Sequence, residues 1–338
     1  MIADDHAFAL RMYLKLFSPL LAMFLARVTI RSVPATMQLL RWIMGSAFIA
    51  YLLLGGLTSR FAVSIVMIVA PFCWPFGAFA DYAALMAPLA LVCWRLFRQW
   101  YYLGLALLLA TSGFLANIRT GILATLASLS VFALLRFGRK GLPLVAAMYI
   151  GVVVAVVTIP GIRDKTFRDQ NDADVSKVAL DPGSIDIEQI DSSGRTATWT
   201  MVLDRFFWPS PTMGSGLGST QTWFYHGGHG ILMVEHSEYV RLLADTGLVG
   251  LGLYLLVIIG CMKNLWTIYR GANHPLVRSL SLVGLCMFPA YLVSMGFDNV
   301  LNYVLPVSQF PFAFTGAAIG LHQALTQARQ GTYVTDPF

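Results

Sequence analysis

The chain has 338 residues, of which 57% are hydrophobic and only 12% are charged. Soluble domains carry about 25% charged residues, so this composition excludes a large soluble enzyme and indicates a polytopic membrane protein. The net charge of +6 comes from basic residues in short segments between apolar runs. Outside these segments the sequence has no basic stripe with interleaved aromatic residues, so no nucleic-acid partner is expected.

The apolar runs, taken in chain order, predict an all-α protein with nine membrane spans. About twenty apolar residues cross a hydrocarbon core of about 30 Å. We expect spans at residues 8–28, 38–58, 77–97, 100–117, 120–137, 142–160, 246–266, 277–297 and 303–323. The apolar run from Phe61 to Pro75 contains Pro71 and ends on a second proline. Because proline removes a helical hydrogen bond, this run predicts a short re-entrant or interfacial segment.

Basic residues gather at alternate ends of these spans and thereby predict the orientation. They are Arg27, Arg31, Arg41, Arg95, Arg98, Arg136, Arg139, Lys140, Lys263, Arg270, Arg278 and Arg329. Under the positive-inside rule these ends are cytoplasmic. The stretch 161–245 then lies on the opposite face, periplasmic or extracellular, together with the start of the chain.

The stretch 161–245 is the main polar part of the sequence. It holds 12 of the 17 acidic residues, whereas none occur between Asp81 and Asp164 or between Asp245 and Asp298. Long stretches without carboxylates avoid the cost of placing charge in lipid. We therefore expect a large extracytoplasmic loop here that contains short helices and carries the polar chemistry.

Three segments carry candidate functional residues. In Asn117–Gly121, Arg119 begins the fifth span, where it either anchors the helix at the interface or acts in a site. Arg195 and Trp199 lie in the run GRTATW, which is followed by GSGLG at residues 214–218. Without a preceding strand or a following Lys-Ser/Thr, these glycines predict a tight turn that approaches a ligand or another helix, not a nucleotide loop.

The third segment, residues 235–250, reads EHSEYVRLLADTGLVG. Its apolar residues recur at helical spacing, which predicts a short surface helix that ends near Gly247 and feeds the seventh span. His236 would lie at the N-terminus of this helix, where the helix dipole keeps the ring neutral and able to accept a proton. The alternatives are an inert loop histidine, or a metal ligand with His226 and His229. Because their spacing fits no zinc pattern, we expect no metal.

Together these motifs are similar to the O-antigen ligase and Wzy-type polysaccharide polymerase superfamily, over residues 75–323. The resemblance rests on Arg-Thr-Gly at the start of a span, Gly-Arg-x-x-x-Trp in the large loop, Gly-x-Gly-x-Gly, and HSEYVRLLADTGLVG at the end of the loop. It divides the chain into N-terminal membrane helices (1–74), a ligase- or polymerase-like domain (75–323) and a cytoplasmic tail (324–338). Family members have further spans before this point, so we expect a shortened form or first spans supplied differently.

The resemblance implies a metal- and cofactor-independent inverting glycosyltransferase in the bacterial inner membrane, with its site facing the periplasm. The donor would be an undecaprenyl-diphosphate-linked oligosaccharide and the acceptor a glycan or lipid A core, with membrane lipid and a chain-length regulator as partners. His236 would act as base, oriented by Glu235 or Glu238, and Arg195 and Arg119 would stabilise the diphosphate. Substrate-binding residues would be Trp199, Gly216, Gly218, Glu238, Tyr239 and Arg241. Trp199, Trp208, Trp223 and Tyr225 would stack on sugars or anchor the loop at the interface.

Several functions remain open from the sequence. We favour a polymerase of repeat units over a ligase that moves a finished glycan to its acceptor, although the shared motifs do not separate the two. A transporter or flippase would need ionisable residues in mid-membrane, and only Arg11 and Lys15 come near that description. A purely structural membrane subunit is the remaining alternative.

Overall fold

The computed structural model describes residues 6–56, 75–159, 163, 195–226, 235–302 and 307–330. Every regular element in these ranges is helical, which confirms the all-α prediction. The predicted re-entrant segment, most of the acidic part of the large loop, His229 and the end of the tail lie outside the described residues.

The expected spans fall on helices of similar bounds. These are α1 (His6–Thr29), α2 (Val33–Ala50) with a π-helical continuation (Tyr51–Gly56), α4 (Pro75–Phe97), α5 (Trp100–Leu115), α6 (Arg119–Phe137), α7 (Leu142–Thr158), α12 (Glu238–Gly271), α13 (Pro275–Phe297) and α14 (Gln309–Arg329). Within the described residues, six helical stretches are long and apolar enough to cross a membrane, and one of them combines α6 with α7. The chain is therefore an integral membrane protein, but the predicted count of nine spans is not confirmed.

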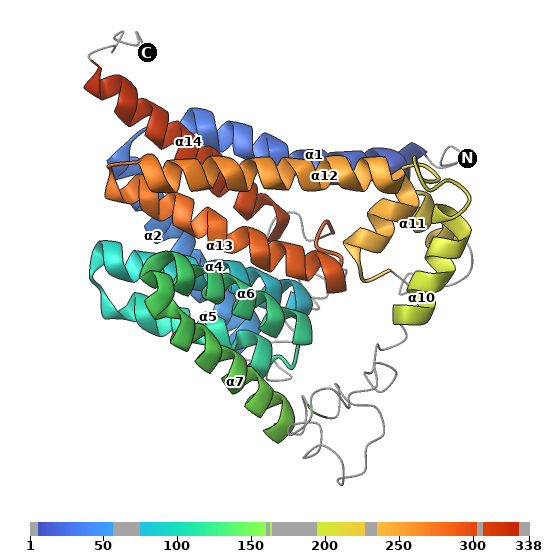
Figure 1. The fold of residues 1–338 in the computed structure, drawn as a ribbon, viewed down its shortest axis with the longest axis horizontal. Coiled ribbons are helices and arrows are strands. Elements are labelled where there is room, and N and C mark those ends of the chain that lie inside the picture. The colour runs from blue at the N-terminus through green and yellow to red at the C-terminus, as the bar shows by residue number, and fades with distance from the viewer. Residues whose placement is uncertain are drawn as a thin grey trace.

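Two helices, α4 and α13, form the centre of the bundle (Figure 1). Leu85 and Met86 of α4 and Met287 and Phe288 of α13 are almost completely buried. α13 contacts α4, α6, α12 and α14, whereas α7 lies at the outer edge and has no buried residue. The central pair therefore supplies the rigid core on which the other helices pack.

The first and last helices of the bundle, α1 and α14, are in close contact. A side-chain carbon at Gly316 would collide with the carbonyl oxygen of Met23, and one at Gly320 with the carbonyl oxygen of Arg27. Two glycines four residues apart on one helix face allow two backbones to approach closely, as in many membrane helix pairs. Ends of the chain that are far apart in sequence are thereby joined.

Short helices of the predicted loop gather at the end of the bundle where α12 begins (Figure 1). They are α10 (Arg195–Val202), a π-helical turn (Leu203–Phe207) and α11 (Ser219–His226). Val202 of α10 and Phe224 of α11 form a small apolar cluster with Val240 and Ala244 of α12. The described part of the loop is thus packed onto the first turns of α12.

Helix α12 is interrupted at Gly247, where the backbone has φ 65° and ψ −168°. The break leaves backbone groups of α12 without helical partners, and the loop at residues 211–216 forms hydrogen bonds with them. Leu248 and Val249 donate to the carbonyls of Pro211 and Thr212, at 2.9 and 3.1 Å. In the other direction, the carbonyls of Ala244 and Asp245 accept from the N–H groups of residues 215 and 216. Because buried backbone groups need partners, this exchange makes the break stable. The predicted end of the surface helix near Gly247 is confirmed.

Replacing Gly247 by alanine should destabilise the protein. A positive φ with an extended ψ is a region almost restricted to glycine and costs another residue roughly 1–3 kcal/mol, and the added carbon would also meet the carbonyl of Thr212. We expect a lower thermal unfolding temperature in detergent. Gly252→Ala is the matched control, because this glycine of the same helix has no atom within 4 Å of the added carbon. Equal unfolding temperatures for Gly247→Ala and wild type would contradict the role assigned to the break.

Candidate active site

His236 lies immediately before the first turn of α12. Ser237 is the N-cap residue, and its hydroxyl accepts a hydrogen bond from the N–H of Val240. His236 itself has φ 48°, a left-handed backbone conformation that residues other than glycine seldom adopt. Such strained residues are concentrated at functional sites, where the surrounding structure holds them in place. The predicted position of His236 at the helix N-terminus is confirmed, and its side chain is 39% exposed.

Asp298, the first residue after α13, faces the imidazole ring of His236. Its Oδ1 atom lies 3.9 Å from Nδ1 of His236. The same oxygen accepts a hydrogen bond from the N–H of Asn299 at 2.8 Å, which fixes the carboxylate. At this distance the carboxylate does not accept a hydrogen bond from the ring, but its negative charge would stabilise an imidazolium that forms there. The structure thus places Asp298 opposite the ring, whereas the Glu238 carboxylate contacts Arg241 and the N–H of Leu301. Orientation of the ring by Glu235 stays a prediction.

Glu238 and Arg241 form a fully buried ion pair one turn apart on α12. Oε1 of Glu238 accepts from the N–H of Leu301 at 2.8 Å, and Arg241 donates to Oδ1 of Asn302 at 3.4 Å. The pair therefore holds the turn that follows Asp298. Because buried charges are stable only when they are paired and hydrogen-bonded, we expect this arrangement to be rigid. Substrate binding by the two residues stays a prediction.

Lys15 of α1 also donates to Oδ1 of Asn302. This contact joins α1 to the turn 298–302 that carries Asp298. The transport alternative depends on Arg11 and Lys15, which come nearest to ionisable residues in mid-membrane. In the structure, Lys15 is hydrogen-bonded to Asn302. The turn is therefore held from α12 and from α1 at once.

Arg195, at the start of α10, contacts the residue adjacent to Asp298. It donates to the carbonyl of Phe297 at 2.7 Å, at the C-terminus of α13. This bond uses one of the five N–H donors of a guanidinium group. The structure therefore brings Arg195, Asp298 and His236 together from the ends of three different helices.

Arg119 begins α6 and lies at the same end of the bundle core. Gly121, two residues later, is so close to Ala80 of α4 that a side-chain carbon there would collide with the alanine methyl. The neighbour of Ala80, Asp81, is buried and accepts a hydrogen bond from Ser294 at 2.7 Å, four residues before Asp298. Arg119 is thus on the same side of the core as the His236–Asp298 pair.

The glycine-rich turn at 214–218 folds around Asp245. Both carboxylate oxygens of Asp245 accept backbone hydrogen bonds, one from Gly218 at 2.9 Å and one from Thr220 at 3.1 Å. Gly216 donates to the backbone carbonyl of Asp245 at 3.0 Å. The sequence predicts a tight turn that approaches either a ligand or another helix. The structure shows the approach to a helix, α12. Contact of Gly216 and Gly218 with substrate stays a prediction.

The aromatic candidates have different surroundings. Nε1 of Trp199 donates to the carbonyl of Glu235 at 2.5 Å, which ties α10 to the residue before His236. Tyr239 donates to the carbonyl of Leu292 at 2.9 Å. Trp208 and Tyr225 are exposed, whereas Trp223 packs against Phe206 and the guanidinium of Arg205. Trp199 and Tyr239 thus position backbone near the site, and sugar stacking stays a prediction.

A metal site formed by histidines of the large loop is an alternative that the sequence offers. Among the residues that the structure describes, no group of three or more histidine, cysteine, aspartate or glutamate side chains is placed to hold a metal ion. The ring of His226 instead packs against Tyr225 and Phe8.

Residues 103–255 match a family model described as O-antigen ligase. This part of the chain is similar to the O-antigen ligase family. The match includes Arg119, Arg195 and His236, and it confirms the resemblance stated from the sequence. The comparison with curated proteins found no match. O-antigen ligase family members are membrane enzymes of the glycosyltransferase type, ligases and polymerases, whose donors are lipid-linked glycans.

Two acidic residues near the candidate site, Asp298 and Asp81, were not predicted from the sequence. Asp298 and Asp81 lie outside the matched region and outside any local motif. A signal was nevertheless present, because both residues border the long stretches without carboxylates. Acidic residues at the ends of such stretches lie at the ends of spans, where charge can serve a site.

Proposed function

We propose that the protein is a glycosyltransferase of the bacterial inner membrane that polymerises undecaprenyl-diphosphate-linked repeat units at the periplasmic face. The observation that supports this most strongly is the grouping of His236, Asp298 and Arg195 at one end of the bundle. A histidine paired with a carboxylate suits proton transfer, and a nearby guanidinium suits a diphosphate. The match to the O-antigen ligase family model supports a lipid-linked glycan as the substrate class.

In the proposed reaction, a hydroxyl oxygen of the acceptor glycan attacks the anomeric carbon of the donor. The bond between that carbon and the diphosphate oxygen breaks, and undecaprenyl diphosphate leaves with the electron pair. His236 takes the proton of the attacking hydroxyl, and Asp298 stabilises the resulting imidazolium. Arg195 and Arg119 stabilise the charge that develops on the diphosphate. Attack opposite the leaving group inverts the anomeric configuration.

Replacing Asp298 by asparagine should lower the turnover number of glycan transfer by about 10²–10⁴-fold, the range of general acid–base catalysis. Asparagine keeps the shape of the side chain but loses the charge that faces Nδ1 of His236. The measurement is transfer by purified protein with a lipid-linked donor. We expect the KM for donor to change little, because the change acts on proton transfer.

Asp204→Asn is the control for this substitution, since Asp204 lies exposed in the same predicted loop. It should transfer glycan at the wild-type rate. If Asp298→Asn instead raised KM and left turnover unchanged, Asp298 would be a binding residue and not the partner of the base.

Polymerase and ligase differ in the product that they make. In a strain lacking its own copy, a polymerase gene should convert single lipid-linked repeats into a ladder of chain lengths. A second strain accumulates long chains on the carrier lipid. If expression of the gene in that strain leads to transfer of these chains to lipid A core, the protein is a ligase. No change of surface or lipid-linked glycan in either background would reject both functions.

A further inference from the structure

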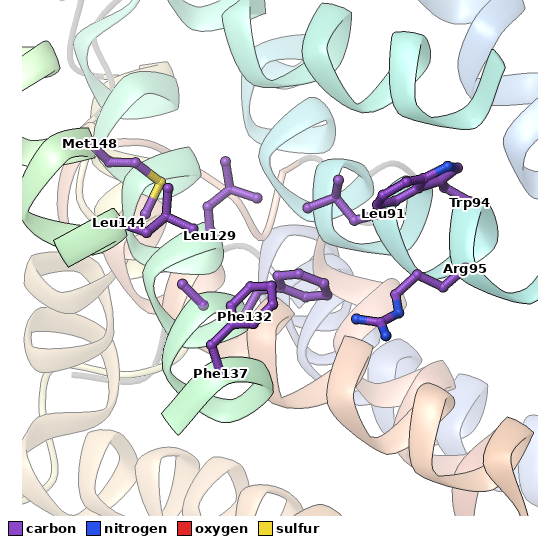
Figure 2. A pocket seen from close by; sticks show the side chains of 9 residues that line it. Leu91, Trp94, Arg95, Leu129, Phe132, Phe137, Leu144 and Met148 are labelled. Atoms are coloured by element: carbon purple, nitrogen blue, oxygen red, sulfur yellow. The ribbon is translucent and has the colours of Figure 1, made fainter. Parts of the chain in front are cut away.

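A cavity of about 220 Å³ lies between α4, α6 and α7. Its walls are mainly apolar and include Leu91 of α4, Phe132 and Phe137 of α6, and Leu144 and Met148 of α7 (Figure 2). It is near the C-termini of α4 and α6, at the opposite end of these helices from Asp81 and Arg119. The cavity is therefore separate from the proposed active site.

Arg95 is the charged residue in the cavity lining. It lies in the last turn of α4, is exposed, and extends across the opening toward the α6 side (Figure 2). Arg98 and Arg136 lie within electrostatic range of Arg95. Arg139 and Lys140 follow in the 3₁₀ turn Gly138–Gly141 that connects α6 to α7. Positive charge is thus concentrated around Arg95, the charged residue of the cavity lining.

This positive charge has no acidic counterpart nearby in the sequence. Residues 82–159 contain no aspartate or glutamate. The positive-inside rule explains basic residues at the predicted cytoplasmic ends of membrane helices. It does not require an apolar cavity beside one of these residues. An apolar cavity with a guanidinium at its mouth fits a ligand that has an apolar tail and an anionic head.

We propose that this cavity binds an anionic phospholipid, with part of an acyl chain between α4, α6 and α7 and the phosphate at Arg95. Basic pockets between membrane helices on the cytoplasmic side recognise anionic head groups in this way. The apolar outer surface of α7, which has no buried residue, would form the lipid-facing side of the site. The assignment is independent of the proposed transfer reaction, because it concerns the opposite end of the bundle.

The test is native mass spectrometry of the delipidated full chain titrated with phosphatidylglycerol or with phosphatidylcholine of the same acyl chains. We expect a clear preference for phosphatidylglycerol. Since a basic residue near a membrane contributes about fivefold to anionic lipid binding, Arg95→Gln should reduce the preference by about fivefold. Leu144→Trp, which fills the cavity from the exposed side of α7, should weaken binding of both lipids.

Arg270→Gln is the matched control, because Arg270 belongs to the same basic end but stacks on Trp266 away from the cavity. It should bind phosphatidylglycerol like wild type. Equal binding of the two lipids by wild type, or a wild-type preference in Arg95→Gln, would overturn the proposal. Displacement of phosphatidylglycerol by undecaprenyl phosphate at much lower concentration would reassign the cavity to an isoprenoid lipid.

Discussion

Replacing His236 by alanine is expected to reduce glycan transfer by about 10²–10⁴-fold, the contribution of a positioned general base. The side chain is exposed and makes its described polar contact with Asp298, so its removal should leave the fold intact. Alanine, like histidine, has a Cβ atom and must adopt the strained φ of 48°, so the unfolding temperature of the variant is measured as well. The measurement is the ladder assay in cells, together with transfer by purified protein normalised to the folded fraction.

His322→Ala is the control for this experiment. His322 lies on α14 beside the cavity lined by His274 and Arg329, near the C-terminus of that helix. It should transfer glycan at the wild-type rate. Wild-type transfer by His236→Ala, with both variants inserted in the membrane, would remove His236 as the base and would leave its strained backbone unexplained.

Substituting Arg195 has the second largest expected effect. Arg195→Ala should lower transfer by about 10²–10³-fold, the value for loss of one donor that stabilises developing charge. Arg195→Lys should also be impaired, because an ammonium does not reproduce the forked donors that a diphosphate accepts. The measurement is kcat/KM with a lipid-linked donor.

Arg195 also has a structural contact, the hydrogen bond to the carbonyl of Phe297, and the experiment must separate the two roles. A purely structural arginine would lower the unfolding temperature, and transfer per folded molecule would stay constant. Arg205→Lys serves as control, because Arg205 lies in the same predicted loop and stacks on Trp223. Full transfer by Arg195→Lys would argue against a bidentate contact with the diphosphate.

The helices and the break in α12 could be predicted from sequence because their signals are local. Apolar runs determine where a helix can lie in lipid. Gly247 directly follows a stretch of apolar residues at helical spacing, and a glycine in that position predicts the end of a helix. The place of His236 before the helix follows from the same pattern. Arg119 and Arg195 were selected through family motifs, and the structure places both at the end of the bundle that holds His236.

The partners of these residues could not be predicted, because they come from distant parts of the chain. Asp298 is 62 positions from His236 and belongs to no motif, so only the packing of α12 on α13 brings it to the ring. Glu238 and Arg241 illustrate the opposite difficulty. An acidic and a basic residue three positions apart look the same in sequence whether they face solvent or, as here, are completely buried.

The contact of Lys15 with Asn302 has a consequence for biogenesis. α1 leaves the ribosome well before its polar partner, which lies 287 residues later, and its main packing partner is α14. Contacts of such long sequence separation form late and leave earlier segments exposed meanwhile. Lys15 therefore cannot make this contact until the residues up to Asn302 have been synthesised. The turn that carries Asp298 is thus completed only when α1 and the start of α12, which both hold it, have packed together.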